Sequence, residues 1–311
     1  MTRHLLRDDD LAPAEQRAVL ELALRLKADR FAISPLAGPR TVAVLFDKPT
    51  LRTQVSFTVG VVELGGYPML VDGKLAQIGV RESVADTAHV LGRQASAIVW
   101  RTYEQSRIEE MAANVDVPVV NALTDDFHPC QVLADLLTIA EHTPGGVDGL
   151  AGRTLAYLGD GANNMAQSYL LGGATAGMHV RIGTPAGHLP DAAVLADAAA
   201  VAAETGGSVT VLHEAVETVR GADVLATDTW VSMGDERSAA EAESLFGPFR
   251  LDQALLETAP EHAIVLHCLP AYRGKEITAE VIDGPRSVVF QEAENRLHAQ
   301  KAVLAWLLEQ S

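Results

Sequence analysis

Short apolar segments alternate with longer amphipathic segments along most of the chain, from Thr41 onward. The short segments are rich in β-branched residues and apolar at successive positions, which is typical of strands buried on both faces of a parallel sheet. The longer segments repeat their apolar residues at helical spacing and therefore predict helices between the strands. This order predicts the α/β class, built from βαβ units.

The same pattern predicts where the elements lie. In the first half, strands are predicted at residues 41–46, 67–71, 97–100 and 118–121, and helices at 53–64, 82–92, 108–114 and 130–142. In the second half, strands are predicted at residues 154–158, 179–182, 209–212, 224–227, 264–266 and 288–290. Helices near the two ends, at residues 14–27 and 292–308, do not follow the repeat, and both are candidates to bridge two domains.

A loop-forming stretch separates the two runs of strands and helices. Residues 143–149 read Thr-Pro-Gly-Gly-Val-Asp-Gly, which is the chemistry of turns, and the alternation restarts at Thr154. At 311 residues the chain is also longer than one hydrophobic core usually covers. We therefore expect two similar parallel-sheet α/β domains, residues 1–145 and 146–291, with the C-terminal helix 292–311 packing back on the first.

Composition narrows the classes of function. Hydrophobic residues make up 48% of the chain and charged residues 21%, which is ordinary for a folded protein. The 24 Lys and Arg against 41 Asp and Glu give a net charge of −17. Such a charge repels nucleic acids and anionic membranes, so we expect neither as a partner. Arginines gathered at one site still suit a small anion.

Cysteine content and the start of the chain predict a reduced, cytoplasmic protein. The two cysteines, Cys130 and Cys268, supply neither a four-thiolate metal site nor a disulfide framework. The first residues contain no apolar run of signal-peptide length. The Ala-rich stretch 192–203 is far shorter than the roughly 20 residues that a membrane helix needs.

A first polar cluster follows the predicted strand 41–46, where the chain turns into a helix. Ligands of open α/β sheets bind beyond such strand ends. Thr50, Leu51, Arg52 and Thr53 bring two hydroxyls, a guanidinium and the N–H groups of a helix start together, which suits a phosphate. The alternative is an ordinary threonine cap beside a surface arginine. A Walker loop is excluded, because its glycines and its Gly-Lys-Ser/Thr ending are missing.

Donor groups follow two further strands of the first half. Arg101 comes directly after the strand 97–100, and His128 and Gln131 lie at the start of the helix that follows the strand 118–121. A neutral histidine at such a place can donate a hydrogen bond to a carbonyl oxygen. The alternatives are a histidine that only caps its helix and a surface arginine.

A glycine-containing turn at residues 159–164, Gly-Asp-Gly-Ala-Asn-Asn, lies between a strand and a helix of the second half. It fails as a dinucleotide fingerprint, because Asn164 takes the place of the third glycine and the next strand ends in Gly183-Thr184 without an acidic residue. An asparagine at a helix start suits instead the carboxylate or ammonium group of an amino acid. The alternative is an asparagine that caps the helix.

Two more strand ends of the second half carry polar residues. After the strand 224–227, Asp228, Ser232 and Met233 offer a carboxylate, a hydroxyl and a flexible apolar side chain, which suit an amine on an aliphatic stem. The strand 264–266 ends in His-Cys-Leu-Pro at residues 267–270. The alternatives are a surface turn and a buried, inert cysteine.

Taken in order along the chain, these motifs resemble the aspartate/ornithine carbamoyltransferases. The motifs are Thr-Leu-Arg-Thr at 50–53, His-Pro-Cys-Gln at 128–131, Ser-Met-Gly at 232–234 and His-Cys-Leu-Pro at 267–270. The last two are most similar to the members that use ornithine. The resemblance implies carbamoyl transfer from carbamoyl phosphate to the δ-amine of L-ornithine, giving L-citrulline and phosphate, in the cleft between two domains. In this direction the reaction belongs to arginine biosynthesis.

The resemblance also implies roles for individual residues. For carbamoyl phosphate binding these are Thr50, Leu51, Arg52, Thr53, Gln77, Arg101, His128, Pro129, Cys130, Gln131, Cys268, Leu269 and Arg296. For ornithine binding they are Asn164, Asp228, Ser232 and Met233, and for catalysis Arg101, His128, Asp228 and Cys268. The implied reaction needs no metal and no organic cofactor, because the amine attacks the carbamoyl carbon directly.

The chain departs from the family pattern in two motifs. Leu51 stands where the family's Ser-Thr-Arg-Thr carries a second hydroxyl, so only its backbone N–H is left for a phosphate. In the segment 77–83, Gln-Ile-Gly-Val-Arg-Glu-Ser, Val80 and Arg81 replace a His and a Lys of the family, whereas Gln77 is retained. In the family this loop reaches a neighbouring subunit, so the resemblance implies a homotrimer or a multiple of trimers.

Three other functions stay open at this point. A carbamoyltransferase for putrescine or an N-acylated ornithine is possible, although Asp228 favours free ornithine, and aspartate would need cations for its second carboxylate. An NAD-dependent oxidoreductase is disfavoured by Asn164 in the failed fingerprint. A non-catalytic binding protein is disfavoured because the cationic, acidic and thiol groups of the motifs are all retained.

Overall fold

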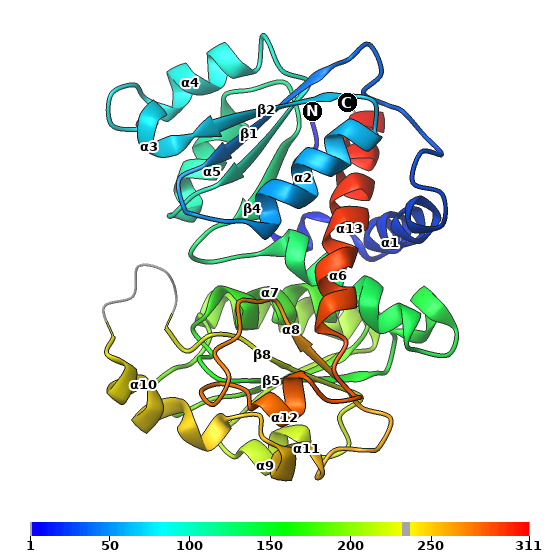
Figure 1. Ribbon diagram of the computed structural model, residues 1–311, viewed down its shortest axis with the longest axis vertical. Coiled ribbons are helices and arrows are strands. Elements are labelled where there is room, and N and C mark those ends of the chain that lie inside the picture. Colours follow the sequence, from blue (N-terminus) through cyan, green and yellow to red (C-terminus); the bar gives the residue numbers. More distant parts are fainter. Residues whose placement is uncertain (1, 232–236, 311) are drawn as a thin grey trace. The chain divides into compact units, whose positions relative to one another are not determined.

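The computed structural model describes residues 2–231 and 237–310 and divides into two compact units (Figure 1). Unit 1 comprises Met1–Leu137 and Glu294–Ser311, and unit 2 comprises Thr138–Ala293. The division therefore falls within two helices, α6 (Pro129–Glu141) and α13 (Val289–Glu309). The parallel α/β class expected from the sequence is confirmed in both units.

Unit 1 is built on a four-stranded parallel sheet with the strand order β2-β1-β3-β4. Its strands are β1 (Thr41–Phe46), β2 (Tyr67–Asp72), β3 (Ala97–Arg101) and β4 (Val119–Leu123). From β1 the chain forms β2 on one side and then β3 on the other, so the direction of winding changes between β1 and β3. Ligand sites of such sheets lie at the carboxyl ends of the strands at this change.

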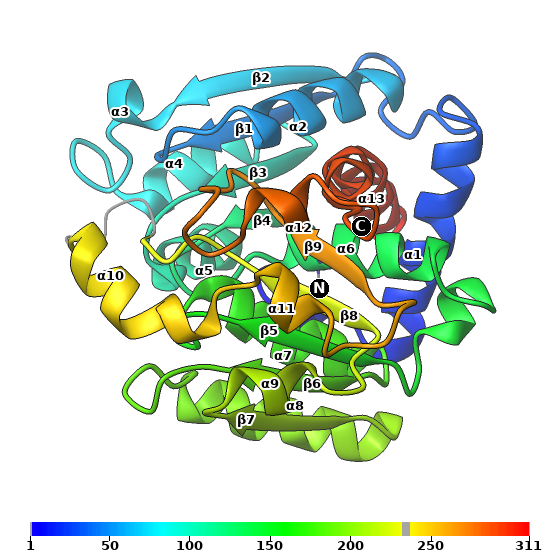
Figure 2. The same cartoon turned by 60° about the horizontal axis from the view of Figure 1, so that its bottom comes forward.

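The helix that follows β1 packs against the C-terminal helix. The helix α2 (Arg52–Glu63) lies beside α13 in both views (Figures 1 and 2), and a Cβ on Gly60 would lie 3.1 Å from Lys301 Cγ. The buried Lys301 ammonium donates to Glu63 Oε2 at 2.7 Å, and Arg30 also pairs with this carboxylate. Breaking a buried pair of this kind is strongly destabilising, so the register of α13 along α2 is fixed.

The other helices of unit 1 are α1 (Pro13–Ala28), α3 (Gly73–Ala76), α4 (Val84–Leu91) and α5 (Gln105–Ala113). Helices α4 and α5 cover the sheet through an apolar core that includes Leu45, Trp100, Ala88, Ile108 and Met111. The helical residues among them occupy the apolar positions from which the sequence predicts the helices. A short 3-10 helix, Asp8–Asp10, precedes α1.

Unit 2 contains a five-stranded parallel sheet with the order β7-β6-β5-β8-β9. Its strands are β5 (Thr154–Leu158), β6 (His179–Gly183), β7 (Ser208–Leu212), β8 (Val224–Thr227) and β9 (Ile264–His267). Its helices are α7 (Asn164–Thr175), α8 (Ala192–Thr205), α9 (Ala215–Val219), α10 (Ala239–Phe246), α11 (Gln253–Leu256) and α12 (Ala279–Ile282), with 3-10 helices at Gly146–Gly149 and Gly247–Phe249. Here the winding changes between β5 and β8, which are hydrogen-bonded neighbours.

The strand predicted at residues 288–290 is wrong, because α13 already begins at Val289. The segment pairs with the sheet at a single bridge, from Ser287 to Val265, and then enters the helix. Val289 is buried whereas Phe290 is 71% exposed. A strand within this sheet would bury both neighbours, so the β-branched run misled the sequence interpretation. The C-terminal helix consequently starts earlier than the predicted residue 292.

Within the two described ranges, the helices are all too short or too polar to cross a bilayer.

Candidate active site

The carboxyl ends of β1 and β3 carry the predicted phosphate cluster in unit 1. After β1 the chain turns at Thr50, whose Oγ1 accepts the backbone N–H of Thr53 at 3.4 Å. Leu51 is the N-cap residue of α2 without a side-chain cap bond, and its side chain is 70% exposed. Leu51 thus supplies only backbone to this helix start, and Arg52 is the first residue of the helix.

Two arginines from distant parts of the chain meet at the Thr53 hydroxyl. Arg296 Nη2, from α13, donates to Thr53 Oγ1 at 2.8 Å, and Arg101 Nη1, at the end of β3, approaches the same oxygen at 3.5 Å. All three side chains are buried. Like charges held this close in a buried place repel each other, so the cluster favours an anion, despite the net charge of −17.

The imidazole of His128 lies in the field of this cluster, just before α6. Its side chain is buried, and burial together with the charges of Arg296, Arg101, Lys48 and Arg52 lowers the pKa of His128 well below its usual value. The ring is therefore neutral at pH 7, since protonation would add one more buried cation. A neutral imidazole is suited to a hydrogen bond with an uncharged carbonyl oxygen.

The neighbouring residues of the motif lie at the start of α6. Pro129 is its first residue, and Gln131 is buried with Nε2 donating to Asp135 Oδ1 at 2.7 Å. The Cys130 thiol donates to the carbonyl of Asn121 at 3.3 Å, and burial raises its pKa to about 12. A thiol with this pKa is inert at neutral pH, so Cys130 has no nucleophilic role.

Gln77 is the remaining predicted residue of unit 1. It follows α3, has a positive φ of 50°, and its side chain is exposed. Within the described part of the chain, the Gln77 side chain makes no hydrogen bond to Thr53, Arg101 or Arg296. A left-handed backbone at a non-glycine residue costs about 1 kcal/mol or more and is often found at functional sites.

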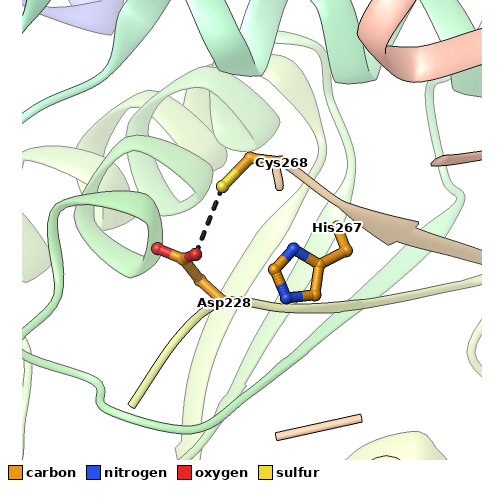
Figure 3. Close-up of side chains that lie close together, drawn as sticks. All are labelled: Asp228, His267 and Cys268. Atoms are coloured by element: carbon orange, nitrogen blue, oxygen red, sulfur yellow. Dashed lines mark hydrogen bonds between the residues drawn. The ribbon is translucent and has the colours of Figure 1, made fainter. Parts of the chain in front are cut away.

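The carboxylate of Asp228 organises the corresponding strand ends in unit 2. Asp228 follows β8, and its Oδ1 accepts the N–H of Thr229 at 2.7 Å and the thiol of Cys268 at 3.2 Å (Figure 3). Its Oδ2 accepts from Asn163 Nδ2 at 3.4 Å. Asn163 also caps α7, because its Oδ1 accepts the N–H of Met165 at 2.7 Å. A carboxylate, a thiol and an amide thus meet where the winding of the sheet changes.

The residues around Cys268 are held by a buried imidazole–carboxylate pair. The N–H of Leu269 donates to His267 Nδ1 at 3.0 Å, so the ring proton lies on Nε2, which contacts Glu276 Oε1 at 3.1 Å. Glu276 also accepts the N–H of Tyr272 at 2.6 Å. Leu269 has a φ of 57°, a strained backbone that these bonds hold in place.

Asp228, His267 and Cys268 are chemically able to ligate a metal ion, because one ligand atom of each lies within 4.8 Å of the others (Figure 3). In the structure, however, both ring nitrogens of His267 are already hydrogen-bonded, one to a backbone N–H that occupies its lone pair. The Cys268 thiol is bonded to Asp228. The imidazole therefore has no lone pair left for a metal ion in this arrangement.

The structure places the remaining predicted residues as follows. Asn164 is the first residue of α7, next to the amide that contacts Asp228. Ser232 and Met233 lie outside the described residues. Asn163 and Glu276 were missed from the sequence. The pair of asparagines at a helix start is a signal for Asn163, whereas no local pattern connects Glu276 with His267.

Comparisons with known families match both units of the chain. Residues 3–141 match the family described as "Aspartate/ornithine carbamoyltransferase, carbamoyl-P binding domain". Residues 151–307 match "Aspartate/ornithine carbamoyltransferase, Asp/Orn binding domain". The two matches lie in the same order as the cationic cluster and the Asp228 site.

Individual proteins are similar over the full length. An ornithine carbamoyltransferase of Clavibacter sepedonicus is 62% identical over 311 residues, which is 100% of both chains. One of Bifidobacterium longum is 61% identical, over 98% of this chain and 95% of that protein. Among solved structures, ornithine carbamoyltransferase from Pyrococcus furiosus is 41% identical with a TM-score of 0.93, over 100% of this chain and 98% of that chain.

Proposed function

Since this chain belongs to the aspartate/ornithine carbamoyltransferase family, we propose that it transfers the carbamoyl group of carbamoyl phosphate to the δ-amine of L-ornithine. The products are L-citrulline and phosphate. One structural observation carries the proposal: two buried arginines share the hydroxyl of Thr53 at a helix start, in a chain that is strongly acidic overall. Such a cluster favours an anion, and phosphate is an anion that a helix N-terminus with arginines binds well.

Under this proposal carbamoyl phosphate binds to eleven residues of unit 1 and to Cys268 and Leu269 of unit 2. The residues assigned to it are Thr50, Leu51, Arg52, Thr53, Gln77, Arg101, His128, Pro129, Cys130, Gln131, Cys268, Leu269 and Arg296. Leu51 and Cys130 take part through their backbone, because the first has no polar side chain and the thiol of the second is bonded to Asn121. Arg101 and the neutral imidazole of His128 act as donors to the carbamoyl oxygen, where negative charge develops as the amine attacks.

Ornithine binds in unit 2, at Asn164, Asp228, Ser232 and Met233. A protonated amine has no lone pair, and the reference pKa of such an amine is about 10.4, so the site has to favour its neutral form. Removal from water lowers the pKa of an amine, and the Asp228–Cys268 pair offers an acceptor for the proton. The nitrogen then attacks the carbamoyl carbon and a tetrahedral intermediate forms. Its carbon–oxygen bond to phosphate breaks, phosphate leaves with the electron pair, and the nitrogen gives its extra proton to the departing phosphate. No covalent intermediate with the protein is involved.

The amine offered to the protein tests this assignment. We expect a ureido product from carbamoyl phosphate with ornithine, and at least about 100-fold less with putrescine, N-acetylornithine or aspartate, because a site built for polar groups rejects analogues that leave them unpaired. Lysine keeps these groups but is one methylene longer, so we expect a loss of about 10- to 200-fold with it. The measurement is the initial rate of colorimetric ureido formation at equal amine concentrations. Faster product formation with another amine would preserve carbamoyl transfer but overturn the substrate, and no product with any amine would overturn the function.

Self-association into a homotrimer, or a multiple of trimers, is the second part of the proposal. It is supported by exposed apolar side chains on one part of unit 1, at Val55 and Val62 of α2, at Tyr67 and Leu70 of the edge strand β2, and at Leu75 and Val80 beyond it. Exposed edge strands and apolar patches of this kind mark interfaces.

Light scattering tests the assembly. We expect a mass near three times 33.0 kDa, or a multiple of it, at micromolar concentration. Leu75→Glu is expected to shift the mass toward the monomer, because it places a charge among apolar side chains that the assembly would bury. A wild-type mass of 33.0 kDa would contradict the proposal.

The proposed direction of the reaction is toward citrulline, in arginine biosynthesis, and the proposed location is the cytoplasm. One similar solved structure, from Campylobacter jejuni, is named an anabolic ornithine carbamoyltransferase and is 32% identical over 99% of this chain and 100% of that chain, with a TM-score of 0.93.

A further inference from the structure

The carboxylate of Asp47 connects the two strand ends that precede the cationic cluster. Asp47 follows β1, and its buried Oδ2 accepts Trp100 Nε1 at 3.1 Å and the Thr102 hydroxyl at 2.6 Å. Its own N–H donates to the carbonyl of Arg101 at 2.9 Å. Asp47 therefore fixes the end of β1 relative to β3, immediately before the residues proposed to bind phosphate.

The same carboxylate also lies against the start of α3. A Cβ on Gly73 would come within 1.9 Å of Asp47 Oδ1, a distance at which no side chain fits. Gly73, the first residue after β2, is thus packed directly on Asp47. Farther along, the turn after α3, residues 77–83, is mostly exposed, including Val80 at 80%. Ile78 is the one buried residue of this turn.

Arg107, on α5, joins this exposed turn to Asp47. Its Nη2 donates to the carbonyl of Ile78 at 2.8 Å and to Asp47 Oδ2 at 3.3 Å. The guanidinium lies over the Trp100 ring, 5.2 Å from its centroid. A Cβ on Gly79 would lie 3.3 Å from Arg107 Nη1, so the backbone of the turn packs closely on the guanidinium.

Among the residues that the structure describes, the other hydrogen bonds of the turn are local and do not connect it with the sheet. The N–H of Gly79 donates to the carbonyl of Glu82 at 2.7 Å, and the N–H of Gln77 donates to that of Gly73 at 2.7 Å. Local bonds shape a turn but leave it able to move as a unit. A charged, planar group that contacts two acceptors and a ring limits such movement.

We propose that Arg107 is a positioning residue for carbamoyl phosphate binding, because it holds the turn that carries Gln77 in a fixed place relative to β1 and β3. Gln77 directly precedes the residue whose carbonyl Arg107 binds. The inference rests on the proposed function, in which Gln77 contacts carbamoyl phosphate, which by the family resemblance is that of a neighbouring subunit. Arg107 itself touches no substrate in this proposal and acts through the turn.

A double-substitution cycle with Gln77 tests this role. Arg107→Met keeps the length and apolar contacts of the side chain and removes its donors. We expect it to raise the KM for carbamoyl phosphate by about tenfold, the effect of losing one charge-assisted hydrogen bond, while kcat and the KM for ornithine change less than about twofold. In the Gln77→Ala background, Arg107→Met is expected to raise this KM no further, because its effect depends on Gln77.

Two matched variants complete the experiment. Arg93→Met removes an exposed arginine of the same unit, whose Nη1 donates to the carbonyl of His89 at 2.6 Å, and is expected to change no kinetic constant. Arg107→Lys keeps the charge without the planar pair of donors. Its KM for carbamoyl phosphate is expected to lie between that of the wild type and that of Arg107→Met. Trypsin should cleave after Arg81 faster in Arg107→Met than in the wild type, because the turn is released.

The outcomes separate the inference from the function on which it rests. An unchanged KM for carbamoyl phosphate in Arg107→Met would overturn the positioning role, as would effects of Arg107→Met and Gln77→Ala that multiply in the double variant. A lower kcat, equal increases in both KM values and a lower melting temperature would also overturn the positioning role, in favour of a purely structural one. A wild-type protein without carbamoyl transfer would instead refute the proposed function.

Discussion

Replacing Arg101 by alanine is expected to lower kcat by about 10²- to 10³-fold, which is the usual loss when one preorganised donor to a developing negative charge is removed. Arg101 is buried at the end of β3, and its Nη1 lies 3.5 Å from the Thr53 hydroxyl that Arg296 also binds. The measurement is steady-state kinetics with both substrates varied.

The fold is expected to survive this substitution. Arg101 lies among other cations, so its removal relieves repulsion within the cluster. It also removes one of the charges that lower the pKa of His128, so this pKa is expected to rise toward its usual value in Arg101→Ala. The melting temperature and the titration of His128 by NMR check both points.

Arg101→Lys is the matched control, because it keeps the charge without the planar pair of donors. We expect its kcat to lie between that of the wild type and that of Arg101→Ala. A folded Arg101→Ala protein with nearly normal kcat would remove Arg101 from the proposed catalytic residues.

Replacing Asp228 by asparagine is expected to lower kcat/KM for ornithine by about 10²-fold while leaving the KM for carbamoyl phosphate nearly unchanged. The substitution preserves shape but removes the charge from the group that accepts the Cys268 thiol and the Asn163 amide. Hydrogen bonds to a charged group contribute about 1.5–3 kcal/mol each, which corresponds to roughly 10- to 100-fold. The measurement is initial rates with ornithine varied at saturating carbamoyl phosphate.

Asp223, at the opposite end of β8, gives a control of equal charge. Burial raises the pKa of Asp223, but hydrogen bonds from the N–H of Thr154 at 2.8 Å, from His262 and from Arg153 at 2.9 Å outweigh it and keep this pKa below the usual value. We expect Asp223→Asn to lower the melting temperature without changing the KM for ornithine. If both variants change this KM equally, the effect is one of net charge, and the proposed role of Asp228 is wrong.

The strands show how far local pattern carries a fold of this kind. Buried parallel strands are continuous apolar runs, so β1, β5 and β8 begin and end where the sequence predicts them. The same rule failed at residues 288–290, where Val289 is buried against the core of unit 2 but the backbone is helical. A short apolar run does not by itself distinguish a strand from a buried helix start.

The candidate site divides in the same way. Arg101 ends a strand and Asp228 follows one, whereas Thr53 and His128 lie at helix starts. The local pattern is therefore enough to place all four at strand ends. The contact between Arg296 and Thr53 spans 243 residues, and it depends on the packing of α13 against α2. Neither residue spacing nor composition predicts that these two side chains are in contact.

The sequence by itself thus determined the α/β class, most strand positions and the polar groups at the strand ends, because these follow from hydrophobic periodicity and from turn chemistry over a few residues. Only the tertiary structure decided which of these groups meet. Helix packing placed Arg296 on Thr53, and the folding of separate segments placed Glu276 on His267 and Arg107 on the turn of Gln77. Such contacts depend on the whole packed unit, since a few ångströms of helix displacement would break them.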